Sequence, residues 1–177
     1  MTLLARVAAI LNEHHIRFAL IGAGAMAAHG VSRATLDQDL LVCDASVLDP
    51  SVWSAMSPAI VDIRRGDADD PLLGVIRIRL DGEPDVVDVV VGRGGWQQGV
   101  LDRARPHPVG ESPLPVVDRP DLILLKLYAG GSQDRWDIES LLAADAERGT
   151  KSVVDQRVPA LPARCRALWE ELRASAR

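Results

Sequence analysis

Two aspartates in one apolar segment have the residue type and the spacing for metal-assisted phosphoryl chemistry. Asp37 and Asp39 lie two residues apart in ATLDQDLLV, whose apolar pattern predicts a strand. Residues i and i+2 of a strand point to the same side, so the two carboxylates are expected together. Like charges side by side need a positive charge between them, and Mg²⁺ accepts a few carboxylates together with substrate phosphates. A solvated pair on an edge strand is the alternative interpretation.

A third aspartate lies in a run that predicts a buried central strand. Asp88 interrupts VVDVVV, and ionised carboxylates are rarely buried without a partner. Asp85, three residues earlier, is expected at the beginning of this strand and facing the other way. Two acids from one strand and a third from its neighbour are what a two-metal phosphoryl-transfer site requires. The predicted metal ligands are therefore Asp37, Asp39 and Asp88.

The segment FALIGAGAMAAHG suggests two incompatible sites. Gly-x-Gly-x-x-Ala after a strand is typical of a dinucleotide-binding turn, but that fold needs a longer crossover helix and repeated strand–helix units. The alternative is a phosphate-cradling turn at Gly22, Ala23 and Gly24, where small residues let backbone N–H groups approach phosphates. Close packing of strand on helix would also explain the glycines. The downstream acids favour the phosphate turn.

The elements that must position these residues follow from the apolar periodicity. We expect a helix over residues 2–15, strands in IRFALIG and ATLDQDLLV, and a short helix between them over residues 25–29. GVIRIRL and DVVDVVV should pair as a hairpin, with Arg77 and Arg79 on a solvated face. GRGGWQQG is expected as a loop, residues 106–120 as a Pro-rich connection, and the chain from Asp121 onward as helical, with a last helix after Pro162.

Composition limits the classes of protein. The 177 residues suffice for about one domain, and 47% hydrophobic with 25% charged residues is ordinary for a globular protein. The formal net charge of −5 argues against a general nucleic-acid coat, and two cysteines cannot build a disulfide framework. No apolar run approaches the roughly 18 residues of a membrane span. We expect a cytoplasmic protein with no membrane partner.

The motifs together resemble a known superfamily. IGAGAMAAHGVSRATLDQDLLV resembles the signature of the DNA polymerase β-like nucleotidyltransferases: a small-residue turn, a short helix and an Asp-x-Asp strand. With RPDLILLKLYAGGSQDRWDIESLL, it resembles more narrowly the bacterial branch that includes the abortive-infection-type (AbiEii-like) nucleotidyltransferase toxins. The resemblance implies an α+β fold with a mixed, mostly antiparallel sheet flanked by helices. It also implies a single nucleotidyltransferase domain over residues 1–177, with the catalytic core in 1–105 and a helical portion in 118–177.

The resemblance assigns roles by position. The three acids match the family's metal-binding carboxylates, the Gly-Ala turn matches the one that holds the triphosphate, and a lysine in LILLKLYAG matches one that reaches nucleotide phosphates in the toxin branch. An acid in SQDRWDI, Asp134 or Asp137, matches a further family acid. The catalytic set so implied is Asp37, Asp39, Asp88, Lys126 and Asp137. The nucleotide-binding set is Gly22, Ala23, Gly24, Arg33, Thr35, Lys126 and Asp134.

The residues in the helical portion also allow plainer explanations. A lysine on the buried side of its helix needs an anion, which a triphosphate would supply, but Lys126 could instead extend its head to water at the rim. Asp134 could cap the helix that follows Gly131, and Asp137 is the better candidate to point inward. The chain departs from the family in two places. Its Gly-Ala turn lacks a serine hydroxyl, and AGGSQD lacks the basic residue of many relatives.

The function implied is a nucleotidyltransferase that uses Mg²⁺ or Mn²⁺ and moves a nucleoside monophosphate from an NTP, such as ATP, to a hydroxyl, releasing pyrophosphate. The acceptor would be the 3′ end of an RNA such as tRNA, a protein or a small molecule. A toxin of this kind would have a cognate antitoxin protein as partner. The alternative is a non-catalytic module that binds nucleotide or a partner on a decayed transferase scaffold.

Overall fold

One mixed sheet runs through the first two-thirds of the chain. The structure, a computed structural model, describes residues 1–32, 35, 37–110, 112–145 and 149–175. Seven strands of these residues pair in the order β3-β4-β5-β2-β1-β7-β6. Their bounds are β1 Phe18–Ile21, β2 Asp37–Val42, β3 Ile60–Arg65, β4 Leu72–Arg79, β5 Val86–Gly92, β6 Arg105–Val109 and β7 Ser112–Val116.

Most strand pairs in this sheet are antiparallel. The pairs β1–β2, β3–β4, β4–β5 and β6–β7 are antiparallel, and β2–β5 and β1–β7 are parallel. The expected hairpin is therefore β4–β5, and the expected mixed, mostly antiparallel sheet is confirmed. The parallel pair β2–β5 places the two acid-bearing strands side by side at the centre of the sheet.

The two faces of the central strands differ in polarity because side chains alternate along a strand. One face carries fully buried apolar residues, among them Leu40, Val89 and Ile76. Helix α1 (Leu3–Glu13) packs on this side through Val7 and Leu11, which have no exposed surface. The opposite face carries the acids and arginines, and residues such as Leu41 are buried there too. One face of the central strands is thus mainly apolar, and the other combines charged and apolar residues.

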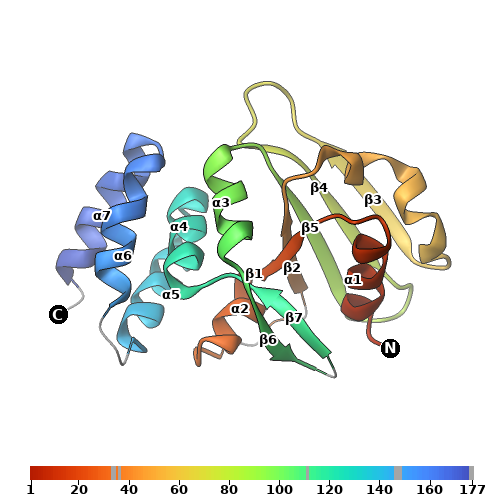
Figure 1. Cartoon of the computed structure of the whole chain (residues 1–177), viewed down its shortest axis with the longest axis horizontal. Helices are drawn as coiled ribbons and strands as arrows, with labels where there is room; N and C mark the ends of the chain where they lie inside the picture. The colour runs from red at the N-terminus through yellow and green to blue at the C-terminus, as the bar shows by residue number, and fades with distance from the viewer. Residues whose placement is uncertain (33–34, 36, 111, 146–148, 176–177) are drawn as a thin grey trace.

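Helices α4–α7 form one end of the molecule and strands β3–β5 the other (Figure 1). Helix α4 lies at the centre of the helical end, where it packs against α5, α6 and α7 and also touches α2. The helices are α1 Leu3–Glu13, α2 Gly22–Ala28, α3 Gly95–Arg103, α4 Arg119–Ala129, α5 Ser132–Ala143, α6 Thr150–Arg157 and α7 Ala163–Ser175, with short 3₁₀ turns at Ala45–Leu48, Pro50–Met56 and Val158–Ala160.

Ion pairs join helix α3 to the helical end of the molecule. Arg103 of α3 binds Asp121 of α4 through two hydrogen bonds of 2.8 Å, and Arg157 of α6 reaches the same carboxylate at 2.9 Å. The Asp121 side chain is fully buried. Burial raises the pKa of Asp121, although the two guanidinium groups oppose the rise. A buried carboxylate with two cationic partners fixes α3, α4 and α6 relative to one another.

Several elements differ from the sequence expectation. Helix α2 begins at Gly22, three residues earlier than expected, so the glycine turn is the first turn of the helix itself. The expected loop GRGGWQQG contains the beginning of α3, because the buried Gln97 side chain accepts hydrogen bonds from the N–H groups of Arg93 and Gly94. Strand β3 was also not expected, whereas α6 lies in the stretch that was expected to be helical.

The Pro-rich connection is in fact the hairpin β6–β7. Pro106 lies opposite Pro115, and Pro108 lies opposite Pro113. Positions without an N–H group therefore face each other, and the alternate residues remain free to form the ladder. Strand β6 is at the edge of the sheet, where proline is tolerated.

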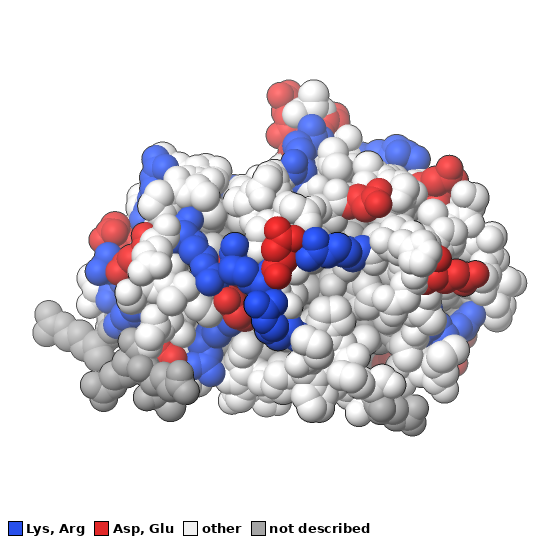
Figure 2. Space-filling model, viewed as in Figure 1, with Lys and Arg blue, Asp and Glu red and all other residues white. Residues whose placement is uncertain are grey.

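Two further features concern helix length and surface charge. None of the helices in the described residues is long and apolar enough to cross a membrane. On the face seen in Figure 2, acidic and basic side chains lie beside one another across the middle of the surface. The charges on that face are interleaved rather than gathered by sign.

Candidate active site

The three predicted metal ligands lie on the same face of the sheet. Strand β2 carries Asp37 and Asp39, and its parallel pairing with β5 sets Asp39 directly opposite Asp88. Paired residues on neighbouring strands point to the same face, and so do residues two apart. All three carboxylates therefore lie on one face of two adjacent central strands.

Gly22 allows the backbone at the beginning of helix α2 to approach Asp39 closely. Ile21, the last residue of β1, pairs with Asp39, and Gly22 follows it with a φ of +59°, in the left-handed region that favours glycine. A Cβ atom at this position would fall on the Asp39 carboxylate and lie 2.9 Å from its Cγ. The position thus needs glycine both for its backbone conformation and for the space that Asp39 occupies.

The other two residues of the turn are packed. Ala23 is buried, and a Cβ atom at Gly24 would lie 2.8 Å from Gln38 Oε1 and 3.1 Å from the Leu20 methyl groups. Close strand–helix packing therefore accounts for Gly24, as the plainer interpretation of the sequence suggested. Gly22, by contrast, lies directly against a predicted metal ligand, Asp39.

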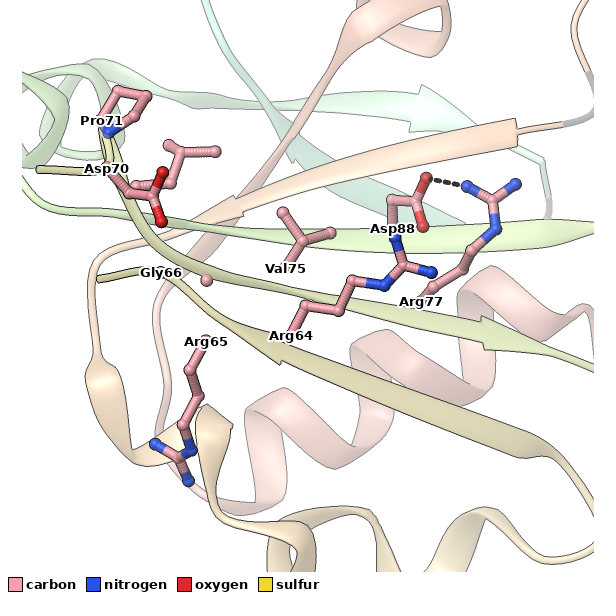
Figure 3. Close-up of a pocket in the computed structure, with 10 residues that line it drawn as sticks. Arg64, Arg65, Gly66, Asp70, Pro71, Val75, Arg77 and Asp88 are labelled. Carbon is pink, nitrogen blue, oxygen red and sulfur yellow. Dashed lines mark hydrogen bonds and ion pairs between the residues drawn. The ribbon is translucent and has the colours of Figure 1, made fainter.

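Arg77 bridges two of the acids. Its Nη1 donates to Asp88 Oδ2 at 2.7 Å (Figure 3), and its Nη2 donates to Asp37 Oδ2 at 3.3 Å. Strand β4 places it there, because Arg77 lies directly opposite Asp88 in the antiparallel β4–β5 pair. The expectation that Arg77 lies on a merely solvated face is wrong. Its place in the alternating strand was evident from the sequence, but the strand partner that supplies the acid was not.

Asp88 is more enclosed than Asp37, the other acid that Arg77 contacts. Its side chain is 15% exposed, whereas that of Asp37 is 47% exposed. Burial raises the pKa of Asp88 above its usual value, Arg77 opposes the rise, and Asp37 adds to it. Asp88 Oδ1 is buried and has no hydrogen-bond partner among the described residues. This carboxylate therefore retains one oxygen that those residues do not satisfy.

The donors suit a hard divalent cation. Carboxylate oxygens are the ligands that Mg²⁺ prefers, and the unsatisfied Asp88 oxygen is available to such an ion. Within residues 1–32, 35, 37–110, 112–145 and 149–175, no three acidic, histidine or cysteine side chains are yet close enough together to hold a metal ion. The guanidinium of Arg77 lies between Asp37 and Asp88 instead.

A pocket of about 360 Å³ opens beside Asp88 over strands β3 and β4. Its lining includes the apolar Leu72 and Val75, and the side chains of Arg64 and Arg77 lie next to Asp88 at one end of it (Figure 3). The segment 66–71 forms another wall. Tyr128 of α4 donates a hydrogen bond to Pro71 O at 3.4 Å, so the helical end of the molecule supports this wall.

The residues just before β2 are described only in part. The Asp37 N–H donates to Thr35 Oγ1 at 3.2 Å, and the Thr35 hydroxyl lies at the same distance from Asp37 O. Thr35 thus holds the backbone at the beginning of the acid-bearing strand. Arg33, the other member of the predicted Arg-x-Thr pair, lies outside the described residues.

The predicted lysine and its acids form a buried group between α4 and α5. Lys126 Nζ lies 2.5 Å from Asp137 Oδ2 and 3.5 Å from Asp134 Oδ1, and the side chain of Lys126 is 8% exposed. The expected burial of Lys126 is correct, and carboxylates of α5 supply an anion for it. Asp134 also accepts the Gly131 N–H at 3.0 Å, which is the capping role considered from the sequence. Asp137 points inward and is fully buried.

Comparison with solved structures gives the same fold. The crystal structure of ANT(2'')-Ia in complex with adenylyl-2''-tobramycin aligns with a TM-score of 0.62 over 89% of this chain and 95% of that chain, at 12% identity. The solution structure of the antibiotic-resistance factor ANT(2'')-Ia aligns at 0.59, over 88% of this chain and 89% of that one, also at 12% identity.

A nucleotidyltransferase-like protein from Paracoccidioides brasiliensis aligns at a TM-score of 0.47 over 91% of this chain and 89% of its own, at 15% identity, which is too slight a likeness to bear on function. No family model matches the sequence, and no curated protein matches it. The nucleotidyltransferase fold expected from the sequence is confirmed. The resemblance to the abortive-infection-type branch stays a prediction.

Proposed function

We propose that this protein is a nucleotidyltransferase that moves a nucleoside monophosphate from an NTP to a hydroxyl group. One observation carries the proposal: Asp37, Asp39 and Asp88 lie on one face of two adjacent strands in a chain with a nucleotidyltransferase fold. The reaction forms a bond between the acceptor oxygen and the α-phosphorus and breaks the bond from that phosphorus to the bridging oxygen. Pyrophosphate is the leaving group.

The three carboxylates would hold Mg²⁺ or Mn²⁺. When bound, the ion would neutralise charge on the attacking and leaving oxygens. Asp37 and Asp39 come from one strand and can share an ion, and Asp88 offers its unsatisfied Oδ1. Gly22 positions Asp39 by giving its carboxylate room against the backbone, and Thr35 fixes the beginning of β2.

Asp88 is also the candidate to receive the proton of the acceptor hydroxyl. Burial raises the pKa of Asp88, so its carboxylate holds a proton more readily than an exposed aspartate does. It lies at the end of the pocket over β3 and β4, through which an acceptor can approach. Asp88 would accept the proton as the oxygen–phosphorus bond forms.

The phosphates of the NTP would lie toward the Gly22 turn, with Ala23, Gly24, Arg33 and Thr35 around it, as the resemblance implies. Lys126, with Asp134 and Asp137 beside it, belongs to the same proposed nucleotide site. Lys126 reaches a phosphate only by exchanging its present carboxylate partners for it, at least in part. An RNA acceptor such as tRNA and a cognate antitoxin are part of this proposal only through the resemblance to the toxin branch.

Label transfer tests the function directly. The protein would be incubated with each α-labelled NTP, Mg²⁺ and total RNA, and in parallel without RNA. We expect label in RNA or on the protein itself, and none with Asp39→Asn. Asp62→Asn is the matched control, because Asp62 of β3 lies on the same face of the sheet as the three acids and is half-exposed. Equal labelling by the wild type and Asp39→Asn would contradict the proposal.

A non-catalytic binding module is the second candidate. The bridging of Asp37 and Asp88 by Arg77 favours it, because an internal cation can neutralise these acids permanently. Calorimetry with Mg²⁺ and NTP separates the two functions. Tight binding without transfer to RNA, protein or water would favour the module, and turnover that depends on Asp39 would exclude it.

A further inference from the structure

Arg77 contacts two candidate sites, the pair of acids on the sheet and the pocket over β3 and β4. Its guanidinium contacts Asp37 and Asp88. Its side chain also lines the pocket over β3 and β4, beside Asp88 (Figure 3). The side chain is 44% exposed, so surrounding residues do not lock it in place. Arginine has a long side chain with several rotatable bonds, and its head can move by several ångströms while its backbone stays in the sheet.

The contacts of Arg77 compete with cation binding. A divalent ion bound through Asp88 Oδ1 and Asp37 would lie beside the guanidinium that now donates to the Oδ2 atoms of both carboxylates. The ion and the guanidinium would repel each other at such short distance. The pair Asp37–Asp88 can therefore hold either the internal cation or the external one, and binding of a metal ion requires that Arg77 leave.

The pocket is where a displaced Arg77 can go. Arg64 lines the same pocket, comes from the neighbouring strand and lies close enough to lower the pKa of Asp88. Arg65 points away from Arg64 and Arg77 (Figure 3). Arg64 already pairs with Asp62 at 3.1 Å, and the carboxylate that lines the pocket, Asp70, lies at the end away from Arg64 and Arg77 (Figure 3). Two guanidinium groups close together repel each other, and an anion between them relieves the repulsion. A bound anion would therefore stabilise the displaced side chain in the pocket.

The direction of the reaction makes this pocket the acceptor side. Attacking and leaving oxygens lie on opposite sides of the α-phosphorus in an in-line displacement. If the triphosphate lies at the Gly22 turn, beside β1, the acceptor must come from the other direction, across β5 toward β4 and β3. The pocket lies on this path.

We propose that Arg77 is a counter-ion shared by two sites: it holds Asp37 and Asp88 in the free protein, is displaced by the divalent cation, and then binds an anionic group of the acceptor together with Arg64. This inference rests on the proposed function and names the acceptor class, a hydroxyl compound that carries a negative charge near the reacting group. It also sets an order of binding, because the acceptor site is complete only after the cation has displaced Arg77.

Cation binding tests the first half without any activity measurement. The affinity for Mn²⁺ would be measured by the loss of the free-ion electron paramagnetic resonance signal, without nucleotide. We expect Arg77→Gln to bind Mn²⁺ about tenfold more tightly than the wild type, because no internal cation competes. Arg77→Lys should bind with intermediate affinity. Arg79→Gln is the control, since Arg79 is exposed on the same face two residues away, and it should match the wild type.

An anion probe tests the second half. Sulfate, compared with chloride at equal ionic strength, should tighten Mn²⁺ binding to the wild type severalfold, because it stabilises Arg77 in the pocket. The effect should vanish in Arg77→Gln and in Arg64→Gln. An equal effect of sulfate in all three proteins, or none in the wild type, would overturn the anionic acceptor site.

The outcomes separate this inference from the proposed function. If Mn²⁺ binds the wild type and Arg77→Gln equally, with both folded by circular dichroism, the inference fails and the proposed function stands. If Mn²⁺ binds neither protein, or binds Asp39→Asn as well as the wild type, both fail. Weaker binding to Arg77→Gln than to the wild type would overturn the counter-ion role.

Discussion

Two regions of this protein bury an aspartate against arginine, and they do so differently. In the helical end, Asp121 is fully buried and its two oxygens accept bonds from Arg103 and Arg157. On the sheet, Asp88 is also largely enclosed, but it shares Arg77 with Asp37, and its Oδ1 has no partner in the part of the chain that the structure describes. Burial raises the pKa of both carboxyls, so burial alone does not distinguish them.

The difference lies in how completely the protein satisfies each carboxylate. A buried charge with all its hydrogen bonds made inside the protein joins elements together and has no capacity left for a ligand. A buried charge with an unsatisfied oxygen costs stability unless something else binds there. We infer that the ion pairs of the helical end stabilise the fold, and that the acids on the sheet bind a cation and a nucleotide.

The largest effect should be on nucleotidyl transfer, and it should come from replacing Asp88, the carboxylate with an unsatisfied oxygen. Asp88→Asn should reduce nucleotidyl transfer by roughly a hundredfold to ten-thousandfold, because the variant can neither hold a cation fully nor accept a proton. Its melting temperature should stay near that of the wild type in metal-free buffer. Single-turnover rates and thermal unfolding measure the two properties. Asp62→Asn should retain transfer within about threefold, and an active Asp88→Asn would break the comparison.

The second-largest effect should be on stability, and it should come from replacing the buried acid of the helical end. Asp121→Asn should lower the free energy of unfolding by roughly 2–4 kcal/mol, because it leaves Arg103 and Arg157 without their shared partner; the 36% exposure of Arg103 moderates the loss. Chemical denaturation measures this change. Asp102→Asn, which breaks a surface pair with Arg17, should leave the unfolding midpoint unchanged. A loss of transfer without a loss of stability would contradict the structural role of Asp121.

The third prediction concerns the approach of the backbone to the acids. Gly22→Ala should cost roughly 1–3 kcal/mol of stability and about a hundredfold in transfer, because the new Cβ meets Asp39 and φ is positive. Gly82→Ala is the matched control: its φ is +75°, but nothing lies within 4 Å of the added atom. Both variants should lose stability, and only Gly22→Ala should lose transfer. Equal transfer by the two would remove the role of Gly22.

The periodicity of the sequence predicted that the acids share one face of the sheet, but it did not predict which residues lie beside them. The two-residue spacing put Asp37 and Asp39 on one side of a strand, and the apolar run around Asp88 indicated a buried strand. The parallel register that sets Asp39 against Asp88 depends on tertiary packing and could not be read from either segment. Arg77 was missed for the same reason, since an arginine in an alternating strand is usually solvated.

Elements with unusual composition were the least predictable. The beginning of α3 is rich in glycine, and the side chain of Gln97 compensates by accepting two backbone N–H groups, a contact that no local propensity describes. The hairpin β6–β7 contains prolines that lie opposite one another, which only the pairing itself makes tolerable. The helices α4 and α5 followed from ordinary apolar periodicity and were expected correctly in outline.

The smallest effect should be on the pH dependence of stability. The folded state raises the pKa of Asp88 above the ordinary value of 3.8, so the native protein holds this proton more tightly than the unfolded chain does. Stability contributed by protonated Asp88 is therefore lost as pH rises from about 3.8 through the higher folded-state pKa. Denaturation of the wild type and Asp88→Asn in metal-free buffer between these limits should show a wild-type deficit that grows with pH. A constant difference would contradict the burial cost at Asp88.

The most direct test of the comparison is the shift in melting temperature on adding Mg²⁺ with each NTP. At a nucleotide concentration about a hundredfold above the dissociation constant, we predict a rise of roughly 5–10 °C for the wild type with at least one NTP. Asp88→Asn should show a much smaller rise although it is folded. Equal shifts in the two proteins, or no shift in the wild type with any NTP, would contradict the claim that the acids on the sheet are kept open for a cation and a nucleotide.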